Sequence, residues 1–560
     1  MRVVVNLTRC QGYAQCAFLA PDVFRMRGDE ALMYDPQPDD AQRDRVLRAA
    51  AACPVQAIRV DSIDDREAAA EARMAASAAA GGPPGPTPPR AVAPDQASTP
   101  VPGLRNAAIE AFRRHGRIVV VGASLAGLAA AATLRREGFT GTLTMIGDES
   151  CRPYDRPPLS KQVLDGWVAP EHTGLPRADE LNARWLLGVP ATGLDLAGAR
   201  VHLGDGGTVG YDRLLIATGT RARPWFNSAE AALDGVFLLR TRDDAARLRR
   251  RLADRPRRVL VIGGGFTGSE VASVCRDRDL AVTVVERGPA PLAGALGGVI
   301  GAVAADLQRE HGVDLRCGVT VTALEGDGDG RLRRARLSDG GTIDAEVAVV
   351  ALGAIRNTEW LRGSGLAAGH WGVGCDAGCR AFDVNGVVTD DVFVAGDVAR
   401  FPHPLYDYQF LALEHWGNAV AQAQVAAHNM ISAHGDRWPH LASPVFWSAQ
   451  FGTNIKSVGV PTFADQVVIA QGSVEERRFV AAYGYRGRIT AAVGFDQGKW
   501  LESYQSQIER AAAFPPEPRP GDRQPVPAQI PDHTIRERQA TVVVTGHDPS
   551  ERRAQLVHHR

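Results

Sequence analysis

The sequence predicts a multidomain α/β protein, and three observations carry that prediction. The chain has 560 residues, which is longer than the size at which a single hydrophobic core stops growing. Residues 116–515 alternate apolar, β-rich runs with helical patterns, as α/β folds do. Two strand–loop–helix segments in that range carry glycine-rich loops of the dinucleotide-binding pattern. We therefore expect two nucleotide-binding units in one chain.

Composition limits the class of partner. The formal net charge is −1, so no basic surplus points to a nucleic-acid or membrane partner. Eight cysteines in a chain of this length are too few for a disulfide scaffold. No signal-peptide pattern precedes Val3. These features predict a cytoplasmic protein, and we expect a monomer or a weak dimer.

Two Pro-rich stretches divide the chain. Residues 66–105 are rich in Ala, Pro and Gly without apolar periodicity, which predicts a linker. Residues 1–65 form a compact unit before it, beginning with the strand-like "RVVVN" and ending near "AIRVDS". Residues 516–560 form a Pro-rich tail, to which we assign no function.

The first glycine loop lies in "RIVVVGASLAGLAAAATL". Its first and third glycines allow a tight turn and close helix–strand packing, and the helix N-terminus offers N–H groups to a pyrophosphate. An acidic pair follows, Asp148 and Glu149, where a ribose hydroxyl would bind. The candidate loop residues are Gly122, Ser124, Leu125, Ala126 and Gly127. Alone, such a loop can also be a packing feature.

A second loop, in "RVLVIGGGFTGSEVASV", makes two bound dinucleotides the better interpretation. Glu286 closes the next strand, where a carboxylate accepts from an adenosine 2′-OH and repels a 2′-phosphate. This favours NADH, while the adjacent Arg287 leaves NADPH open. The candidate loop residues are Gly263, Gly265, Phe266, Thr267 and Gly268.

Residues 116–515 then show a specific resemblance. The segments "VGASLAGL", "RPYDRPPLSK", "LLIATGTRARP", "VIGGGFTGSE", "VALGAIRN", "TDDVFVAGDVAR", "LEHWGNA" and "PVFWSAQFG" occur in order. They resemble the FAD-dependent ferredoxin reductases of the putidaredoxin-reductase and biphenyl-dioxygenase-reductase type. The resemblance implies a glutathione-reductase-like fold in four segments. These are an FAD domain split into 106–225 and 353–432, an NAD domain at 226–352, and a C-terminal α/β interface domain at 433–515.

The same resemblance implies roles for matched residues. Lys161 and Glu270 would pair near the flavin atom that receives hydride, with Trp416 bordering the flavin edge. Ordinary ion pairing and core packing are the alternatives. The FAD contacts implied at matched positions are Arg156, Lys161, Thr218, Arg223, Asp397, Glu414, His415 and Trp416, and those of NAD include Glu270 and Gly353.

A redox cysteine pair of the kind that disulfide-reducing flavoenzymes need is missing from the sequence pattern. Cys151, Cys275 and Cys317 are isolated, and Cys375 and Cys379 form only a C-x3-C that we expect to be buried. Electrons taken from a reduced nicotinamide therefore need another exit.

The N-terminal segments "CQGYAQC", "PDVF" and "ACPVQAI" resemble small single-cluster bacterial ferredoxins, which implies an α+β ferredoxin-like domain. Cys10, Cys16 and Cys53 are the candidate iron–sulfur ligands, and Tyr13 stands where a further cysteine would lie. Three soft thiolates without a fourth favour a [3Fe–4S] cluster. A [4Fe–4S] cluster with Tyr13 or water on one iron, and no cluster at all, remain as alternatives.

The hypothesis that joins these observations is an electron relay. NADH would reduce FAD, and the flavin would pass single electrons to the fused ferredoxin and then to a terminal oxygenase, which we expect to be a cytochrome P-450. The alternatives are an NADH oxidase, peroxidase-like or nitrite-reductase-like flavoenzyme with a sensing cluster, and a non-enzymatic flavin-bound scaffold.

Overall fold

A computed structural model describes residues 1–61, 102–176, 178, 180–518, 525–528, 541–545 and 553–557. Most of the expected linker, residues 66–101, lies outside the described residues. Residues 102–105 belong instead to helix α4 (Pro102–His115). Proline suits the first turn of a helix, where its missing N–H is not needed. Phe112 of α4 then packs at 5.9 Å from the ring of Phe139.

The N-terminal domain is small and mixed in class. Strands β1 (Val3–Val5) and β4 (Ile58–Val60) pair antiparallel, so both strand-like ends of the sequence unit form one ribbon. The rest of the domain consists of the hairpin β2 (Phe24–Arg27)–β3 (Ala31–Tyr34) and helices α1 (Gln15–Leu19) and α2 (Arg43–Ala52). Its apolar core contains Cys16, and Cys10 and Cys53 pack against that core.

The first nucleotide-binding domain is built on a six-stranded sheet with order β24-β25-β11-β5-β6-β7. Its strands come from two separate parts of the chain, and all neighbours pair in parallel except β24. Helices α5 (Leu125–Arg136) and α12 (Trp416–Met430) belong to this domain, with many contacts to each other. The strands are β5 (Arg117–Val121), β6 (Thr142–Gly147), β7 (Arg184–Leu187), β11 (Arg213–Ile216), β24 (Arg380–Phe382) and β25 (Val388–Val394).

The second nucleotide-binding domain has a parallel sheet of order β13-β20-β14-β15-β16. Helices α8 (Arg242–Ala253), α9 (Phe266–Asp277) and α11 (Gly298–Glu310) lie in the same stretch of chain. The strands are β13 (Val236–Phe237), β14 (Val259–Ile262), β15 (Val282–Glu286), β16 (Asp314–Cys317) and β20 (Val347–Val350). A parallel sheet buried on both faces explains the continuous apolar run of β14.

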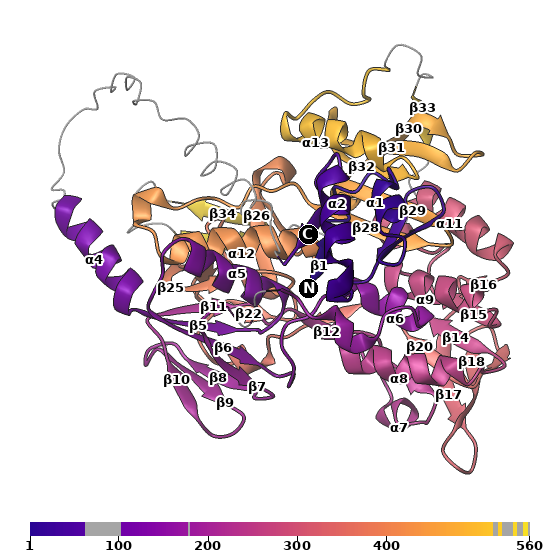
Figure 1. Ribbon diagram of the computed structural model, residues 1–560, viewed down its shortest axis with the longest axis horizontal. Helices are drawn as coiled ribbons and strands as arrows, with labels where there is room; N and C mark the ends of the chain where they lie inside the picture. The colour runs from indigo at the N-terminus through magenta and orange to yellow at the C-terminus, as the bar shows by residue number, and fades with distance from the viewer. Residues whose placement is uncertain are drawn as a thin grey trace.

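The C-terminal domain is an antiparallel sheet of order β28-β29-β32-β31-β30-β33, with helix α13 (Leu501–Glu509) packed against β29 and β32. The strands are β28 (Val445–Gln450), β29 (Thr453–Gly459), β30 (Gln466–Ser473), β31 (Arg478–Tyr485), β32 (Arg488–Phe495) and β33 (Val526–Ala528). Figure 1 shows the indigo N-terminal domain lying where the two nucleotide-binding domains and this C-terminal domain meet.

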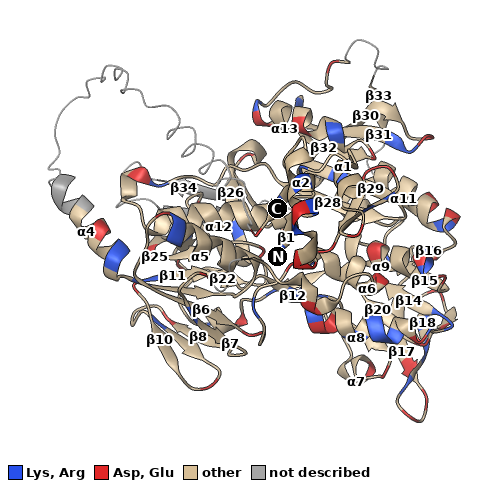
Figure 2. Ribbon diagram, viewed as in Figure 1, with Lys and Arg blue, Asp and Glu red and all other residues tan. Residues whose placement is uncertain are grey.

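Along the described ribbon in Figure 2, basic and acidic residues are interspersed over all the domains. Within the described ranges, we find no helix with the length and apolar composition that crossing a bilayer requires.

Candidate functional site

The loop after β5 is shaped by two glycines. Gly122 has φ of +122°, and a Cβ there would lie 2.0 Å from the carbonyl oxygen of Ala217. A Cβ on Gly127 would lie 2.0 Å from the carbonyl oxygen of Gly122. Neither position can hold a larger residue without a backbone shift. Ser124 is the N-cap residue of α5, and its side chain does not cap the helix. The first-turn N–H groups, including those of Leu125 and Ala126, are therefore available to a pyrophosphate.

The acids after β6 have different surroundings. Asp148 is exposed, whereas Glu149 is half-buried and its Oε1 lies 2.7 Å from an Arg156 guanidinium nitrogen. The Tyr154 hydroxyl also donates to Glu149, at 2.5 Å. The structure thus brings Glu149 and Arg156 together beside the first loop and leaves Asp148 apart.

The second loop repeats the backbone geometry of the first. Gly263 has φ of +106°, and a Cβ on Gly268 would lie 2.0 Å from the carbonyl oxygen of Gly263. Gly265 is the exposed N-cap residue of α9 and provides no side-chain cap. Thr267 is exposed in the first turn, while the Phe266 ring packs edge-on against Phe446 at 4.8 Å.

Glu286 is fixed at the end of β15 by backbone donors. Its carboxylate accepts hydrogen bonds from the N–H groups of Gly264 at 2.7 Å and Gly288 at 2.6 Å. The carboxylate therefore lies against the glycine loop, which is where an adenosine ribose is bound in this fold. Arg287 is exposed beside it.

Lys161 and Glu270 form an ion pair at the junction of three domains. The Lys161 Nζ lies 2.7 Å from Glu270 Oε2, and the side chains are only 13% and 8% exposed. Ser160 donates to the same oxygen at 2.6 Å, and Ser448 of β28 donates to Oε1 at 2.7 Å. Three donors fix this buried carboxylate in one orientation.

Asp397 follows β25 and lies beside the first loop. A Cβ on Gly396 would approach the Ala126 side chain to 3.0 Å, so the turn that carries Asp397 packs directly on α5. Asp397 Oδ2 lies 2.9 Å from an Arg240 guanidinium nitrogen and accepts from the Thr220 hydroxyl at 3.2 Å. Arg240 occurs in none of the sequence motifs and was missed.

The segment Glu414–Trp416 leads into helix α12 and lies beside Asp397. Burial raises the pKa of Glu414, and Asp397 raises it further, while Arg356 at 3.6 Å opposes that shift. Burial lowers the pKa of His415 to about 4, so this imidazole is neutral near pH 7.

Trp416 begins α12 and is held by a buried acid. Its indole Nε1 donates to Asp155 Oδ1 at 2.9 Å, and its ring packs edge-on against Trp447 at 6.5 Å. Burial raises the pKa of Asp155. Asp155 lies inside the quoted motif "RPYDRPPLSK" and could have been found there, but sequence reasoning missed it.

Thr218, Arg223 and Gly353 join the two parts of the first nucleotide-binding domain. The Thr218 hydroxyl donates to the carbonyl of Asn357 at 2.8 Å. The backbone N–H of Arg223 donates to the carbonyl of Gly353 at 2.9 Å, and its exposed guanidinium reaches the carbonyl of Leu352. Nothing lies within 4 Å of a Cβ built on Gly353, which leaves space next to the second loop.

The three N-terminal cysteines lie in one neighbourhood. Burial raises the pKa of Cys16 to about 11, and the proximity of Cys10 and then Cys53 adds to this shift. The pKa of Cys10 is also raised by burial, with the N–H of Gly12 acting in the opposite direction. Cys53 Sγ accepts from the N–H of Ala57 at 3.3 Å. Backbone donors aimed at sulfur are what a thiolate-held cluster uses to stabilise its charge.

Among the described residues, no three His, Cys, Asp or Glu side chains converge on one point as a single metal ion requires. In an iron–sulfur cluster the thiolates bind different iron atoms, so their sulfur atoms lie farther apart than the ligands of one ion. The cysteine neighbourhood therefore fits a cluster and not a lone ion. The Tyr13 phenol is 56% exposed and donates to Gln11 at 2.9 Å. Its hydroxyl therefore has a partner in Gln11, and the residue lies largely in solvent.

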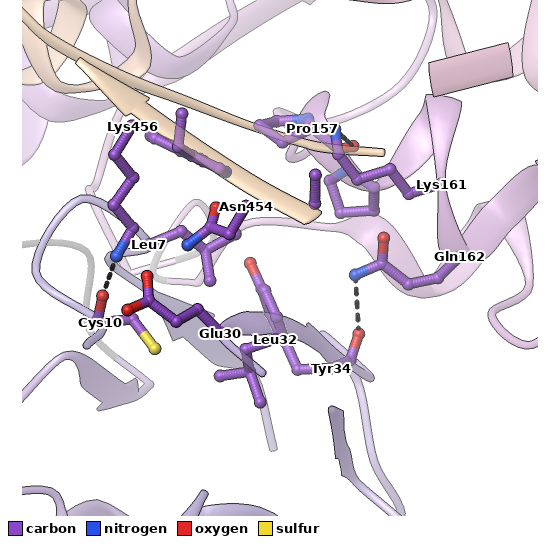
Figure 3. Close-up of a pocket in the computed structure, with 13 residues that line it drawn as sticks. Leu7, Cys10, Glu30, Leu32, Tyr34, Pro157, Lys161, Gln162, Asn454 and Lys456 are labelled. Atoms are coloured by element: carbon purple, nitrogen blue, oxygen red, sulfur yellow. Dashed lines mark hydrogen bonds between the residues drawn. The ribbon is translucent and has the colours of Figure 1, made fainter. Parts of the chain in front are cut away.

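A small cavity, partly open to solvent, lies between the N-terminal domain and the reductase domains. Figure 3 shows Cys10, Glu30 and Tyr34 on one side and Lys161 and Lys456 on the other. Lys456 donates to the carbonyl of Cys10, and the buried Tyr34 hydroxyl donates to Asp155 at 3.0 Å. Cys10 of the candidate cluster site and Lys161 of the ion pair therefore border one space, an arrangement that the sequence patterns did not reveal.

All eight cysteines are free in the structure. Cys375 and Cys379 are completely buried, and burial raises the pKa of both thiols well above the usual value. Cys151 is half-buried, and burial raises its pKa as well. None of these groups has the lowered pKa typical of a reactive thiol.

Three family models match consecutive parts of the chain. Residues 5–60 match the 4Fe-4S single cluster domain of Ferredoxin I. Residues 116–423 match the pyridine nucleotide-disulphide oxidoreductase family, and residues 445–521 match the reductase C-terminal domain.

Similar proteins of named activity cover most of the reductase part. The ferredoxin–NAD(+) reductase component of the p-cumate 2,3-dioxygenase system of Pseudomonas putida is 35% identical over 345 residues, covering 61% of this chain and 81% of that protein. Putidaredoxin reductase of Pseudomonas putida is 31% identical over 413 residues, covering 70% and 93%.

Solved structures of ferredoxin reductases also resemble this chain. The covalent putidaredoxin reductase–putidaredoxin complex superposes with a TM-score of 0.66 at 30% identity, covering 71% of this chain and 93% of that one. The ferredoxin reductase for the CYP199A2 system from Rhodopseudomonas palustris gives 0.64 at 29%, covering 71% and 98%. The expected two-dinucleotide reductase fold with a fused ferredoxin domain is confirmed. The chain belongs to the pyridine nucleotide-disulphide oxidoreductase family and carries a single-cluster ferredoxin domain ahead of the reductase.

Proposed function

We propose that the protein is a ferredoxin–NAD(+) reductase fused to its own ferredoxin. The observation that carries the proposal is the shared cavity, bordered by Cys10 of the ferredoxin domain and by Lys161 of the reductase. The similar proteins named as reductases act in systems with a ferredoxin, and here the ferredoxin domain lies on the same chain.

The chain's own residues bind and orient two dinucleotides in this proposal. When bound, FAD accepts a hydride from NADH and releases electrons one at a time to the iron–sulfur cluster. Gly122 and Gly127 let the first loop approach one pyrophosphate, and Gly263 and Gly268 do the same for the other. Glu286 selects NADH, because its carboxylate accepts from a 2′-hydroxyl and repels a 2′-phosphate.

Two side-chain groups position the reacting ring. The Lys161–Glu270 pair is buried and held by Ser160 and Ser448, so the ammonium has a fixed place next to the cavity. Trp416 is oriented through its hydrogen bond to Asp155. In this proposal the ion pair would set the charge near the hydride acceptor. Trp416 shares Asp155 as a hydrogen-bond partner with Tyr34 of the ferredoxin domain.

The proposed cluster is [3Fe–4S], held by Cys10, Cys16 and Cys53. Support comes from the three neighbouring thiols and from the exposed position of Tyr13. Electron paramagnetic resonance of the protein as isolated tests this, because an oxidised [3Fe–4S] cluster gives a signal and an oxidised [4Fe–4S] cluster is silent. A silent, iron-loaded protein would favour [4Fe–4S].

The proposed terminal acceptor is a cytochrome P-450 monooxygenase. One structural relative is a reductase for the CYP199A2 system, while another relative belongs to a dioxygenase system. Substrate oxidation by purified P-450 and dioxygenase components, with NADH and this protein as the only electron source, separates the two.

Stopped-flow spectroscopy tests the relay itself. After NADH is mixed with the protein, flavin absorbance should fall first and cluster absorbance second. In a Cys16→Ser variant, the first phase should persist and the second should vanish. A flavin that is reduced while the cluster stays oxidised in the unmodified chain would contradict the proposed function.

A further inference from the structure

The hairpin β2–β3 of the ferredoxin domain makes a set of charged contacts that the relay does not require. We propose that this hairpin, residues 24–34, is a docking element that fixes the ferredoxin domain on the reductase of the same chain. We further propose that Arg27 at its tip holds the FAD and NAD domains together. The inference rests on the proposed function. It adds that the docking of the ferredoxin domain, which receives the electrons, also holds the FAD and NAD domains in one arrangement.

Arg27 contacts two acids that belong to different domains. Its guanidinium lies 2.9 Å from Asp165, at the end of helix α6 (Gln162–Asp165) in the FAD domain. It also pairs with Asp277, at the end of α9 in the NAD domain. Burial raises the pKa of Asp277, Arg27 lowers it, and Asp165 raises it again. The two carboxylates therefore lie close enough to repel each other, and Arg27 supplies the cation that offsets the repulsion.

The turn of the hairpin fits the C-terminal domain closely. Gly28 has φ of +64°, and a Cβ there would lie 1.8 Å from the carbonyl oxygen of Gly452, in the turn between β28 and β29. Only glycine allows this close approach, and glycine adopts this backbone conformation without strain. Glu30 is buried and accepts from the backbone N–H of Gly498 at 3.0 Å.

Each side of the contact contributes both acidic and basic residues to its ion pairs. Asp29 of the hairpin pairs with Arg478 of β31, whereas Arg27 faces acids of the two nucleotide-binding domains. The Arg25 guanidinium adds a contact 4.5 Å from the Trp167 ring of the FAD domain. The contacts at the far end of the hairpin, from Tyr34 to Asp155 and from Gln162 to the Tyr34 carbonyl, fix its direction. The cation of Arg27 and the anion of Asp29 at the tip face opposite charges, which favours this orientation of the hairpin over a reversed one.

The occupant of this surface is the chain's own ferredoxin domain. Forty residues separate Asp61 from Pro102, and an extended chain of that length reaches at most about 140 Å. A tether of this kind gives an effective concentration of order mM. Modest ion pairs are then sufficient to keep the domain docked, and they remain weak enough for it to leave.

Hydrogen exchange measured by mass spectrometry on the full chain tests the docking element without relying on activity. Arg27→Glu places three carboxylates together, so we expect amides of residues 24–34 and of the end of α9 to exchange at least tenfold faster. Arg48→Glu, the same charge change on the exposed face of α2, should leave them unchanged. Unchanged exchange in Arg27→Glu would overturn the proposal.

A second pair of variants separates docking from misfolding. Arg27→Glu with Asp277→Arg retains one cation and two carboxylates in a new order, and protection should return at least in part. Gly28→Ala should raise exchange in the hairpin by steric means alone. Loss of protection that the double variant does not restore, together with a Gly28→Ala variant that behaves like the unmodified chain, would contradict the docking geometry.

Protein concentration identifies the occupant. Protection that is the same at low and high concentration supports docking within one chain, and protection that rises with concentration would assign the surface to a second copy. The two proposals also fail separately. If NADH does not reduce the cluster but the hairpin is protected, the relay fails and the dock stands. If hairpin exchange is unchanged in Arg27→Glu while NADH still reduces the cluster, the dock fails and the relay stands.

Discussion

The two glycine loops and the ferredoxin dock hold their partners by different physical means. In both loops a missing side chain matters most, because a Cβ at Gly127 or Gly268 would lie 2.0 Å from a carbonyl oxygen. The dock has one such glycine, Gly28, but most of its contacts are side-chain charges and hydrogen bonds, such as those of Arg27 with Asp165 and Asp277. A site where backbone atoms are in close contact cannot accept an added side chain without a backbone shift. A network of partly exposed charges loses only part of its binding free energy when one charge is changed. A side chain at the third glycine should thus disable a loop, and a single charge change should only loosen the dock.

The largest expected effect is at the third glycines. Gly127→Val should yield protein without flavin, and Gly268→Val should keep its flavin while NADH-driven flavin reduction falls at least 100-fold. That loss corresponds to about 2.7 kcal/mol, which is within the range for overpacked sites. Flavin content by absorbance and stopped-flow rates check both. Gly294→Ala, where a Cβ meets nothing within 4 Å, is the control. Gly268→Val with unmodified rates would remove the packing argument.

The Lys161–Glu270 ion pair should show the next largest effect. It is closely packed like the glycine loops, and it depends on charge like the dock. Lys161→Met leaves the Glu270 carboxylate buried with two hydroxyl donors and no cation. We expect the free energy of unfolding to fall by about 3 kcal/mol, because a buried charge loses its partner. Glu270→Gln retains an oxygen acceptor and leaves the somewhat more exposed ammonium, so it should cost less. Urea denaturation followed by flavin release measures both, and the reverse ranking would contradict this account.

Coenzyme choice should change less. Glu286→Gln removes a carboxylate that accepts from Gly264 and Gly288. The ratio of kcat/KM for NADH to that for NADPH should fall about tenfold, since a charge-assisted hydrogen bond contributes about 1.5–3 kcal/mol. Steady-state kinetics with both coenzymes measures it, and Glu325→Gln on β17 (Val321–Gly326) is the control. An unchanged ratio would show that Glu286 does not read the ribose.

The smallest effect is a pH dependence near the dock. Burial raises the pKa of Asp496 to about 6, with Glu30 and Asp29 adding to the shift and Arg478 opposing it. The folded protein therefore favours protonated Asp496. The stability contributed in this way is full below pH 4 and is lost as pH rises through about 6. We expect the thermal midpoint to fall by about 2 °C over that window.

An Asp496→Asn variant should lack this component of the pH profile, because the amide does not titrate. Differential scanning calorimetry between pH 4 and pH 7 compares the two proteins. Parallel profiles would show that Asp496 is not responsible.

The sequence predicted those site residues that lie within short contiguous motifs. The glycine loops, Glu286, and the Lys161–Glu270 pair are marked by short motifs, and the structure brings the pair together at 2.7 Å. Arg240, whose contact with Asp397 spans 157 residues, lies in no motif. Tyr34 and Arg27 look like ordinary strand residues, and only tertiary packing puts them against Asp155 and Asp277. Long-range charge pairs carry no local spacing, so one sequence does not predict them.

The central claim is that the flavin and the cluster on one chain form a single electron path. Anaerobic titration with NADH, followed at flavin and cluster wavelengths, tests it most directly. A flavin that takes two electrons and a cluster that takes one should require about 1.5 equivalents of NADH per chain before both absorbances stop changing. An endpoint at about one equivalent, with the flavin reduced and the cluster absorbance unchanged, would contradict the claim.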